Sequence, residues 1–155
     1  MFNKLTVVAF TFSVLFVISC SVKEDPINYG HDECDYCQMT IVDNKYGAEI
    51  VNKQGKAFKF DAAECMLRYI IHGEISEPDI ALTFVTDLTK PGKFVDAQKS
   101  FYLISDKLPS PMGAYLSSFE DKKTASEYHD KHGGELYSWN ELKNYFKSIT
   151  KTHHH

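Results

Sequence analysis

Two helix-start signals constrain the fold of this chain more than any other feature. Asp61 to Glu64 and Ser138 to Glu141 each place a capping residue three positions before a glutamate, which is the spacing of a capping box. They predict helices over residues 62–72 and 139–149, and a short strand pattern ends directly before each helix. A chain in which short strands run straight into helices is typical of a mixed fold, and we expect an α+β architecture.

The other segments divide the chain into two halves with a similar order of elements. The patterns predict strands at 39–42, 46–52, 57–60 and 80–86, then strands at 93–96, 100–105, 114–119 and 135–137 with a helix at 122–131. Phe60-Asp61 parallels Tyr137-Ser138, which indicates a degenerate repeat, although the unequal upstream spacing leaves chance similarity open. If the repeat holds, Met39 and Met112 lie at the junction of two lobes, and a site there draws ligands from both.

The N-terminus has the pattern of a bacterial lipoprotein signal. Lys4 precedes an uncharged apolar run over residues 5–18, which is too short to span a bilayer comfortably and ends just before Cys20. We predict a signal peptide over residues 1–19, acylation of Cys20 and a polar tether over residues 20–29. The alternative is an ordinary cleaved signal with a chance cysteine. An acylated protein of this kind is anchored to a membrane of the cell envelope and faces the periplasm or the cell exterior.

Residues 30–149 are long enough to form one compact body, and residues 150–155 are a polar tail that is either native or a tag remnant. Removal of the signal takes away one charged residue, Lys4, and changes the formal net charge from −4 to −5. An acidic body without a basic run argues against nucleic-acid binding. Nothing in it resembles a nucleophile–base pair, a phosphate loop or a pair of catalytic acids, so we expect no enzymatic activity.

Within nine residues the chain gathers four side chains that bind soft metal ions: His31, Cys34, Cys37 and Met39. Sulfur ligands select Cu(I) and zinc over hard cations, and the signal places these ligands outside the cytoplasm. On an extended strand, Cys37 and Met39 would face the same side with their Cα atoms roughly 7 Å apart. A disulfide between Cys34 and Cys37 is the alternative, because extracytoplasmic compartments are oxidising.

Other candidate side chains receive simpler interpretations. Met112 lies in a loop shaped by two prolines and a glycine, which favours presentation of its thioether over core packing. Cys65 lies within the helix of residues 62–72 and is expected to be a buried, inert thiol. Asp61 is expected to act only as a helix N-cap, and His31 is more readily explained as a solvated loop residue than as a ligand.

Taken together, several of these segments resemble the NosL family, the lipoproteins that accompany nitrous oxide reductase. The resemblance extends from Tyr29 to about Phe146. The resemblance rests on six segments: Tyr36–Met39, Phe60-Asp61 with the following helix, Val85–Asp87, Pro111–Gly113, Ser118-Phe119 and Gly133-Gly134. It implies two related ββαβ-type lobes, over about residues 30–88 and 89–149, that form one compact body.

The same resemblance implies a function. NosL proteins bind Cu(I) and pass copper to the copper centres of nitrous oxide reductase in denitrification, and Cys37, Met39 and Met112 match the positions of their copper-binding motif. Cys34 belongs to a Cys-x-x-Cys pair that only some members have, so its role stays open. We therefore expect a copper metallochaperone whose partner is nitrous oxide reductase or its assembly machinery. The alternatives are a membrane-anchored thiol-disulfide protein that uses Cys34 and Cys37, and a structural zinc-binding module.

Overall fold

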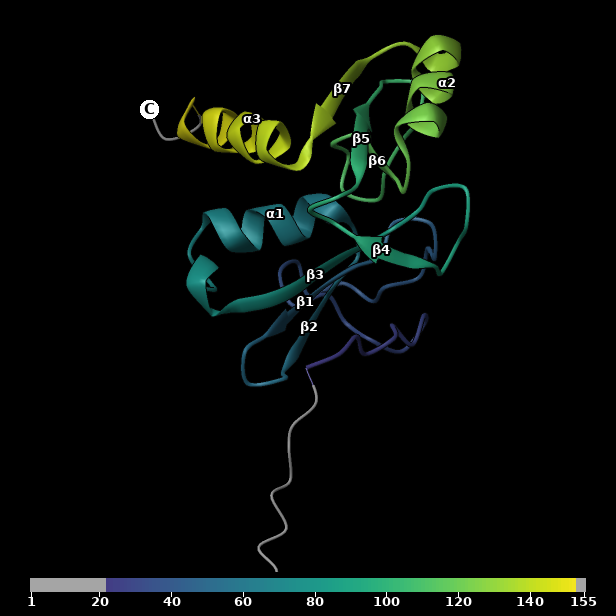
Figure 1. Ribbon diagram of the computed structural model, residues 1–155. Coiled ribbons are helices and arrows are strands. Elements are labelled where there is room, and N and C mark those ends of the chain that lie inside the picture. Colours follow the sequence, from purple (N-terminus) through teal and green to yellow (C-terminus); the bar gives the residue numbers. More distant parts are fainter. Residues whose placement is uncertain (1–21, 153–155) are drawn as a thin grey trace, which may run out of the picture.

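The structure, a computed structural model, describes residues 22–152. The predicted signal peptide, the predicted acylation site Cys20 and the last three residues lie outside this range. Over the described residues the chain forms two small antiparallel sheets and three α-helices, a mixed α/β fold (Figure 1). In the same range no helix is both long enough and apolar enough to cross a membrane.

The first sheet has the strand order β2-β1-β3-β4. Its strands are β1 (Ala48–Asn52), β2 (Ala57–Phe60), β3 (Ile80–Thr86) and β4 (Phe94–Asp96). Between β2 and β3 the chain forms α1 (Ala63–Ile71) and the single 3₁₀ turn η1 (Glu77–Asp79). Gly73 follows α1 at a φ of +80°, a left-handed conformation that glycine adopts without steric cost, and the helix ends before it.

The second sheet has the strand order β6-β5-β7. Its strands are β5 (Phe101–Ile104), β6 (Leu116–Phe119) and β7 (Glu135–Ser138); α2 (Lys122–His132) precedes β7 and α3 (Trp139–Thr152) follows it. In both sheets the first strand of the unit is central and pairs antiparallel with the second and third strands. The two sheets therefore share one order of elements, strand–strand–helix–strand, and one strand order.

This topology corrects the predicted correspondence between the halves. Phe60 ends the second strand of the first unit, whereas Tyr137 lies in the third strand of the second unit. The topological counterpart of the β2–α1 junction is therefore the β6–α2 junction at Phe119 to Asp121. The sequence also grouped β4 with the second half, but β4 pairs with β3 in the first sheet. Capping boxes occur at any helix start, so two of them do not establish that two helices are equivalent.

The three predicted helices are confirmed, with small differences at their ends. At α3 one half of the predicted capping box forms: the Glu141 carboxylate accepts the N–H of Ser138 at 2.8 Å, and the Ser138 hydroxyl also donates to this carboxylate at 2.7 Å. At α1 the predicted capping box is wrong: Ala62 is the N-cap, and no side chain caps this end. Asp61 is instead buried, and Glu64 accepts a hydrogen bond from the Ser110 hydroxyl. Contacts with the second half of the chain therefore replace the local cap.

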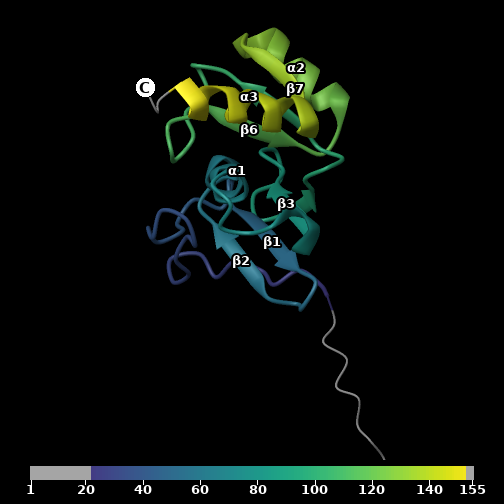
Figure 2. The same cartoon turned by 90° about the vertical axis from the view of Figure 1, so that its left-hand side faces the viewer.

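One hydrophobic core joins the two sheets. α1 lies between the first sheet and α3, as the view in Figure 2 shows. Buried side chains continue from Ile50 of β1 through Leu67 of α1 to Tyr102 of β5 and Phe146 of α3. A smaller cluster lies between α2 and its own sheet. Because the main core crosses from one sheet to the other, the two units are packed into a single body.

The segment before the first sheet is fastened to it, although the sequence described residues 20–29 as a polar tether. Both carboxylate oxygens of the fully buried Glu49 accept the N–H of Asp25, at 3.0 and 3.2 Å. Lys59 pairs with the Asp25 carboxylate at 3.1 Å. Ile27 is buried, and a Cβ at Gly47 would come within 2.7 Å of its side chain. The chain is therefore held against the sheet from Asp25 onwards.

Candidate metal centre

A tight loop carries the first two cysteines. The Cys34 N–H donates to the Met39 carbonyl at 2.8 Å, and Gln38 donates its N–H to the Cys34 carbonyl at 2.9 Å. Gln38 has a φ of +62°, which reverses the chain between Cys37 and Met39. The predicted strand at 39–42 is therefore wrong, since this segment forms a single bridge pair rather than a ladder. The two side chains do not share one face of a strand.

The loop is fixed to β2, and this contact brings it to the helix that carries the third cysteine. The Asp35 N–H donates to the Lys59 carbonyl at 2.8 Å, and the Asp35 carboxylate accepts the Lys59 N–H at 2.7 Å. β2 ends at Phe60, one residue after Lys59, and α1 begins at Ala63. A loop attached at Lys59 therefore lies beside the first turn of α1, where Cys65 is found.

Three cysteine sulfurs meet at this point. The Sγ atoms of Cys34, Cys37 and Cys65 all lie within 4.8 Å of one another, and all three thiols are free. Cys34 and Cys65 are fully buried, whereas Cys37 is half-buried. Cys65 is buried as the sequence predicts, but it faces two other thiols rather than an apolar environment alone. The Cys34–Cys37 disulfide considered as an alternative is not formed.

The sulfur of Cys34 lies at the focus of several hydrogen-bond donors. The S–H of Cys65 contributes most, and the N–H groups of Cys37, Asp61 and Tyr36 also donate to it, the first at 3.5 Å. These donors lower the pKa of Cys34 to about 5, although burial acts in the opposite direction. Cys34 is therefore the sulfur of this cluster that loses its proton most readily.

The other two cysteines keep their protons. Burial is the largest cause that raises the pKa of Cys37. The pKa of Cys65 is raised chiefly because its S–H donates to Cys34, and burial adds to the effect. Within the cluster, Cys37 and Cys65 therefore hold their protons more tightly than Cys34 does. A metal ion bound by all three sulfurs would displace the protons that they carry, because metal-bound cysteine is deprotonated.

Asp61 adds a second acidic group beside the cluster. Its side chain is 4% exposed, and its Oδ1 atom has no hydrogen-bond partner among the described residues. Burial raises the pKa of Asp61 to about 6, and the negative charge of Cys34 contributes next. The expectation that Asp61 is only an N-cap is wrong, because the residue borders the thiolate instead of capping α1.

The predicted methionines occupy different environments near the cluster. Met39 is 57% exposed and lines a cleft that is also lined by Pro109 and Pro111. Met112 is half-buried and packs against the core that also contacts Cys37. The hydroxyl of Tyr46 donates to the Pro109 carbonyl at 2.8 Å, which holds this loop against the first unit. The cleft beside Met39 is therefore built by loops of both halves.

His31 is exposed and lies outside the group formed by the three sulfurs. Tyr36, between the two loop cysteines, forms a hydrogen bond with the exposed His72 across 3.2 Å.

Sequence reasoning missed Cys65 because the residue lies among apolar neighbours on a helix, 28 positions after Cys37. One signal was available: after acylation of Cys20 three cysteines remain, an odd number that suggests a shared site as well as a free thiol.

Comparison with known proteins identifies the family. The model of the NosL family matches residues 28–146, which is well over half of the chain. The chain belongs to the NosL family. A crystal structure of the copper chaperone NosL from Shewanella denitrificans has the same fold, with a TM-score of 0.67 and 23% sequence identity. The match covers 78% of this chain and 96% of the Shewanella chain. No curated protein matched the chain.

Proposed function

We propose that this NosL-family protein is a copper carrier that binds one Cu(I) ion at Cys34, Cys37 and Cys65. The observation that supports it most is the approach of the three sulfurs to within 4.8 Å of one another. Thiolate and thioether ligands favour Cu(I) among the first-row metals. The pKa of Cys34, about 5, also means that one ligand is already in its metal-binding form.

Met39 and Met112 are proposed to add thioether ligands on the accessible side of the cluster. Cys34 and Cys65 have no exposed surface, so copper must enter and leave beside the half-buried Cys37. The exposed Met39 follows Cys37 by two residues and borders the cleft. A thioether is uncharged and flexible, and it needs no deprotonation to bind or release an ion.

Delivery of copper to nitrous oxide reductase, or to its assembly machinery, is part of the same proposal. It is supported by membership of the NosL family and by the description of the Shewanella denitrificans relative as a copper chaperone. We also propose that acylation of Cys20 anchors the protein to a membrane of the cell envelope. The anchor would place the metal centre in the compartment in which an extracytoplasmic recipient is assembled.

The geometry favours copper over the two alternatives. A structural zinc site is usually closed by four ligands, and among the described residues the group of ligand atoms within 4.8 Å of one another holds three cysteines and no fourth member. A thiol-disulfide protein needs an accessible low-pKa thiol. Here the low-pKa cysteine, Cys34, is completely buried.

Competition with a Cu(I) chelator tests the assignment on the reduced, mature chain in detergent. We expect one Cu(I) per chain and much weaker binding of Zn²⁺ in a parallel titration. The Cys34→Ser, Cys37→Ser double variant should lose this binding. Unchanged Cu(I) affinity in the double variant, or zinc binding as tight as copper binding, would contradict the proposed function.

A further inference from the structure

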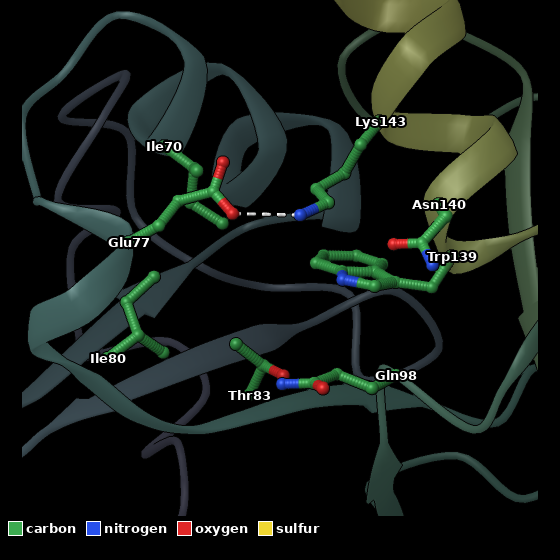
Figure 3. A pocket seen from close by; sticks show the side chains of 8 residues that line it. All are labelled: Ile70, Glu77, Ile80, Thr83, Gln98, Trp139, Asn140 and Lys143. Carbon is green, nitrogen blue, oxygen red and sulfur yellow. Dashed lines mark hydrogen bonds and ion pairs between the residues drawn. The ribbon is translucent and has the colours of Figure 1, made fainter.

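A second pocket lies away from the metal centre, where the two halves of the molecule meet (Figure 3). Its volume is about 160 Å³, below the roughly 300–1,000 Å³ of sites for drug-sized molecules, so its dimensions suit a small ligand. Ile70, at the end of α1, forms one wall, and Trp139, at the start of α3, forms another. No residue of the proposed copper site lines this pocket.

Four polar side chains face this pocket without a hydrogen-bond partner among the described residues. The Thr83 hydroxyl is the most informative, because Thr83 is 5% exposed and its Oγ1 atom is buried. Buried hydroxyl groups are nearly always paired, so an unpaired one that lines a pocket points to a ligand. The amides of Gln98 and Asn140 and the indole N–H of Trp139 are the other three. In Figure 3 these groups surround the same space.

Glu77 and Lys143 are the charged residues that line the pocket, and Lys147 lies beside them as a second partner of Glu77. Glu77 accepts a hydrogen bond from Lys143 at 2.9 Å and pairs with Lys147 at 3.5 Å. Two ammonium groups therefore share one carboxylate, whose pKa is lowered first by the hydrogen bond from Lys143. Lys143 also lies over the Trp139 ring, 5.9 Å from its centroid. A negatively charged group entering the pocket would meet Lys143 without displacing a second acid.

We propose that this pocket binds the carboxylate of a small molecule or of a peptide C-terminus, with Lys143 as its charged partner. A carboxylate accepts several hydrogen bonds and donates none, which complements the hydroxyl, indole and amide donors around the space. Hydrogen bonds from an ammonium group to a carboxylate are also among the stronger ones in proteins. A cation fits less well, because Glu77 is already shared between two lysines.

Ligand binding can be followed by tryptophan fluorescence, because Trp139 is the only tryptophan of the chain. We expect succinate, and the tripeptide Ala-Ala-Ala, to change Trp139 fluorescence with saturation at a Kd of about 1 mM or lower, measured on the mature chain in detergent. Sodium chloride at matched ionic strength is the salt control. Saturation by succinate alone assigns the carboxylate to a free acid, and saturation by the tripeptide alone assigns it to a chain terminus.

Two variants test the named contacts, and a third serves as their control. Lys143→Gln and Thr83→Val should each weaken binding about tenfold, and Lys123→Gln, a change at an exposed lysine on α2, should leave it unchanged. Thr83→Val also removes an unpaired buried hydroxyl, so its thermal midpoint should not fall, which separates lost binding from lost folding. No saturable response in the wild type, equal binding of the amidated tripeptide, or unchanged affinity in both variants would overturn the proposal.

Discussion

Replacement of Cys65 is the sharpest test of the metal centre, because two substitutions separate its possible roles. As a ligand, Cys65 gives copper its third sulfur; as a donor, it only stabilises the thiolate of Cys34. Cys65→Ser keeps a hydroxyl donor but removes the soft ligand, whereas Cys65→Ala removes both. A ligand role predicts that both variants lose copper affinity. A donor role predicts a loss in Cys65→Ala alone.

The size of the expected loss follows from the position of Cys65. Changes in the outer shell of a metal site typically cost about 10- to 100-fold in affinity. Loss of a direct ligand should exceed that range, so we expect the Cu(I) affinity of Cys65→Ser to fall at least ~100-fold. This corresponds to a loss of about 2.8 kcal/mol in binding free energy.

The assay is competition with a Cu(I) chelator at fixed pH, with the thermal midpoint of each metal-free variant measured alongside. Met66→Leu is the matched control, since Met66 is the next residue of α1 and is as fully buried as Cys65. This nearly volume-conserving change should cost less than about 1.5 kcal/mol of stability and leave copper affinity unchanged. If Cys65→Ser bound Cu(I) as tightly as the wild type, Cys65 would not be a ligand and the three-sulfur site would be refuted.

Four further predictions address other parts of the molecule. Met112→Leu should weaken Cu(I) binding less than Cys65→Ser does and change stability by under about 1.5 kcal/mol, as chelator competition and thermal melting would show. Calorimetry in buffers of different ionisation enthalpy should detect proton release on Cu(I) binding at neutral pH, and affinity should fall as pH decreases. Burial raises the pKa of Glu49 from 4.5 to about 7, so the folded chain binds more protons across that window and stability falls as pH rises through it. In denaturant titrations at a series of pH values, the free energy of unfolding of Glu49→Gln should therefore decline by up to about 3 kcal/mol less than that of the wild type. Cys20→Ala should abolish incorporation of labelled fatty acid in a bacterial host.

Much of the architecture could be predicted because its signals are local. β3 appears at the residues where an apolar run between Pro78 and Asp87 predicted a strand. The Ser138–Glu141 capping box fixed the start of α3, since both partners of that contact lie within one turn. α1 kept its predicted extent although its cap failed, because six of its nine residues are buried against the core.

The failures occur where a backbone conformation or a contact is not encoded in the pattern of residue types. The apolar run after Cys37 satisfied a strand pattern, but nothing local indicated that Gln38 would adopt a positive φ and turn the chain. That conformation is supported by two hydrogen bonds to the Cys34 carbonyl. Cys65 joins the site through the attachment of the loop to Lys59, a pairing that no spacing along the sequence encodes. Residue types in the sequence were enough to propose candidate metal ligands. Which of them lie close together could be seen only in the folded structure.

The contact between Asp25 and Glu49 limits how far an anchored form of this protein can act. With Cys20 acylated, five residue steps join the lipid to the point where the chain is held against the sheet. A fully extended chain covers at most about 3.6 Å per residue, so Asp25, where the body begins, would stay within roughly 18 Å of the lipid-bearing residue. Copper exchange would then be confined to a thin layer beside the membrane. Its rate would be set by how often a partner visits that layer rather than by diffusion of the carrier.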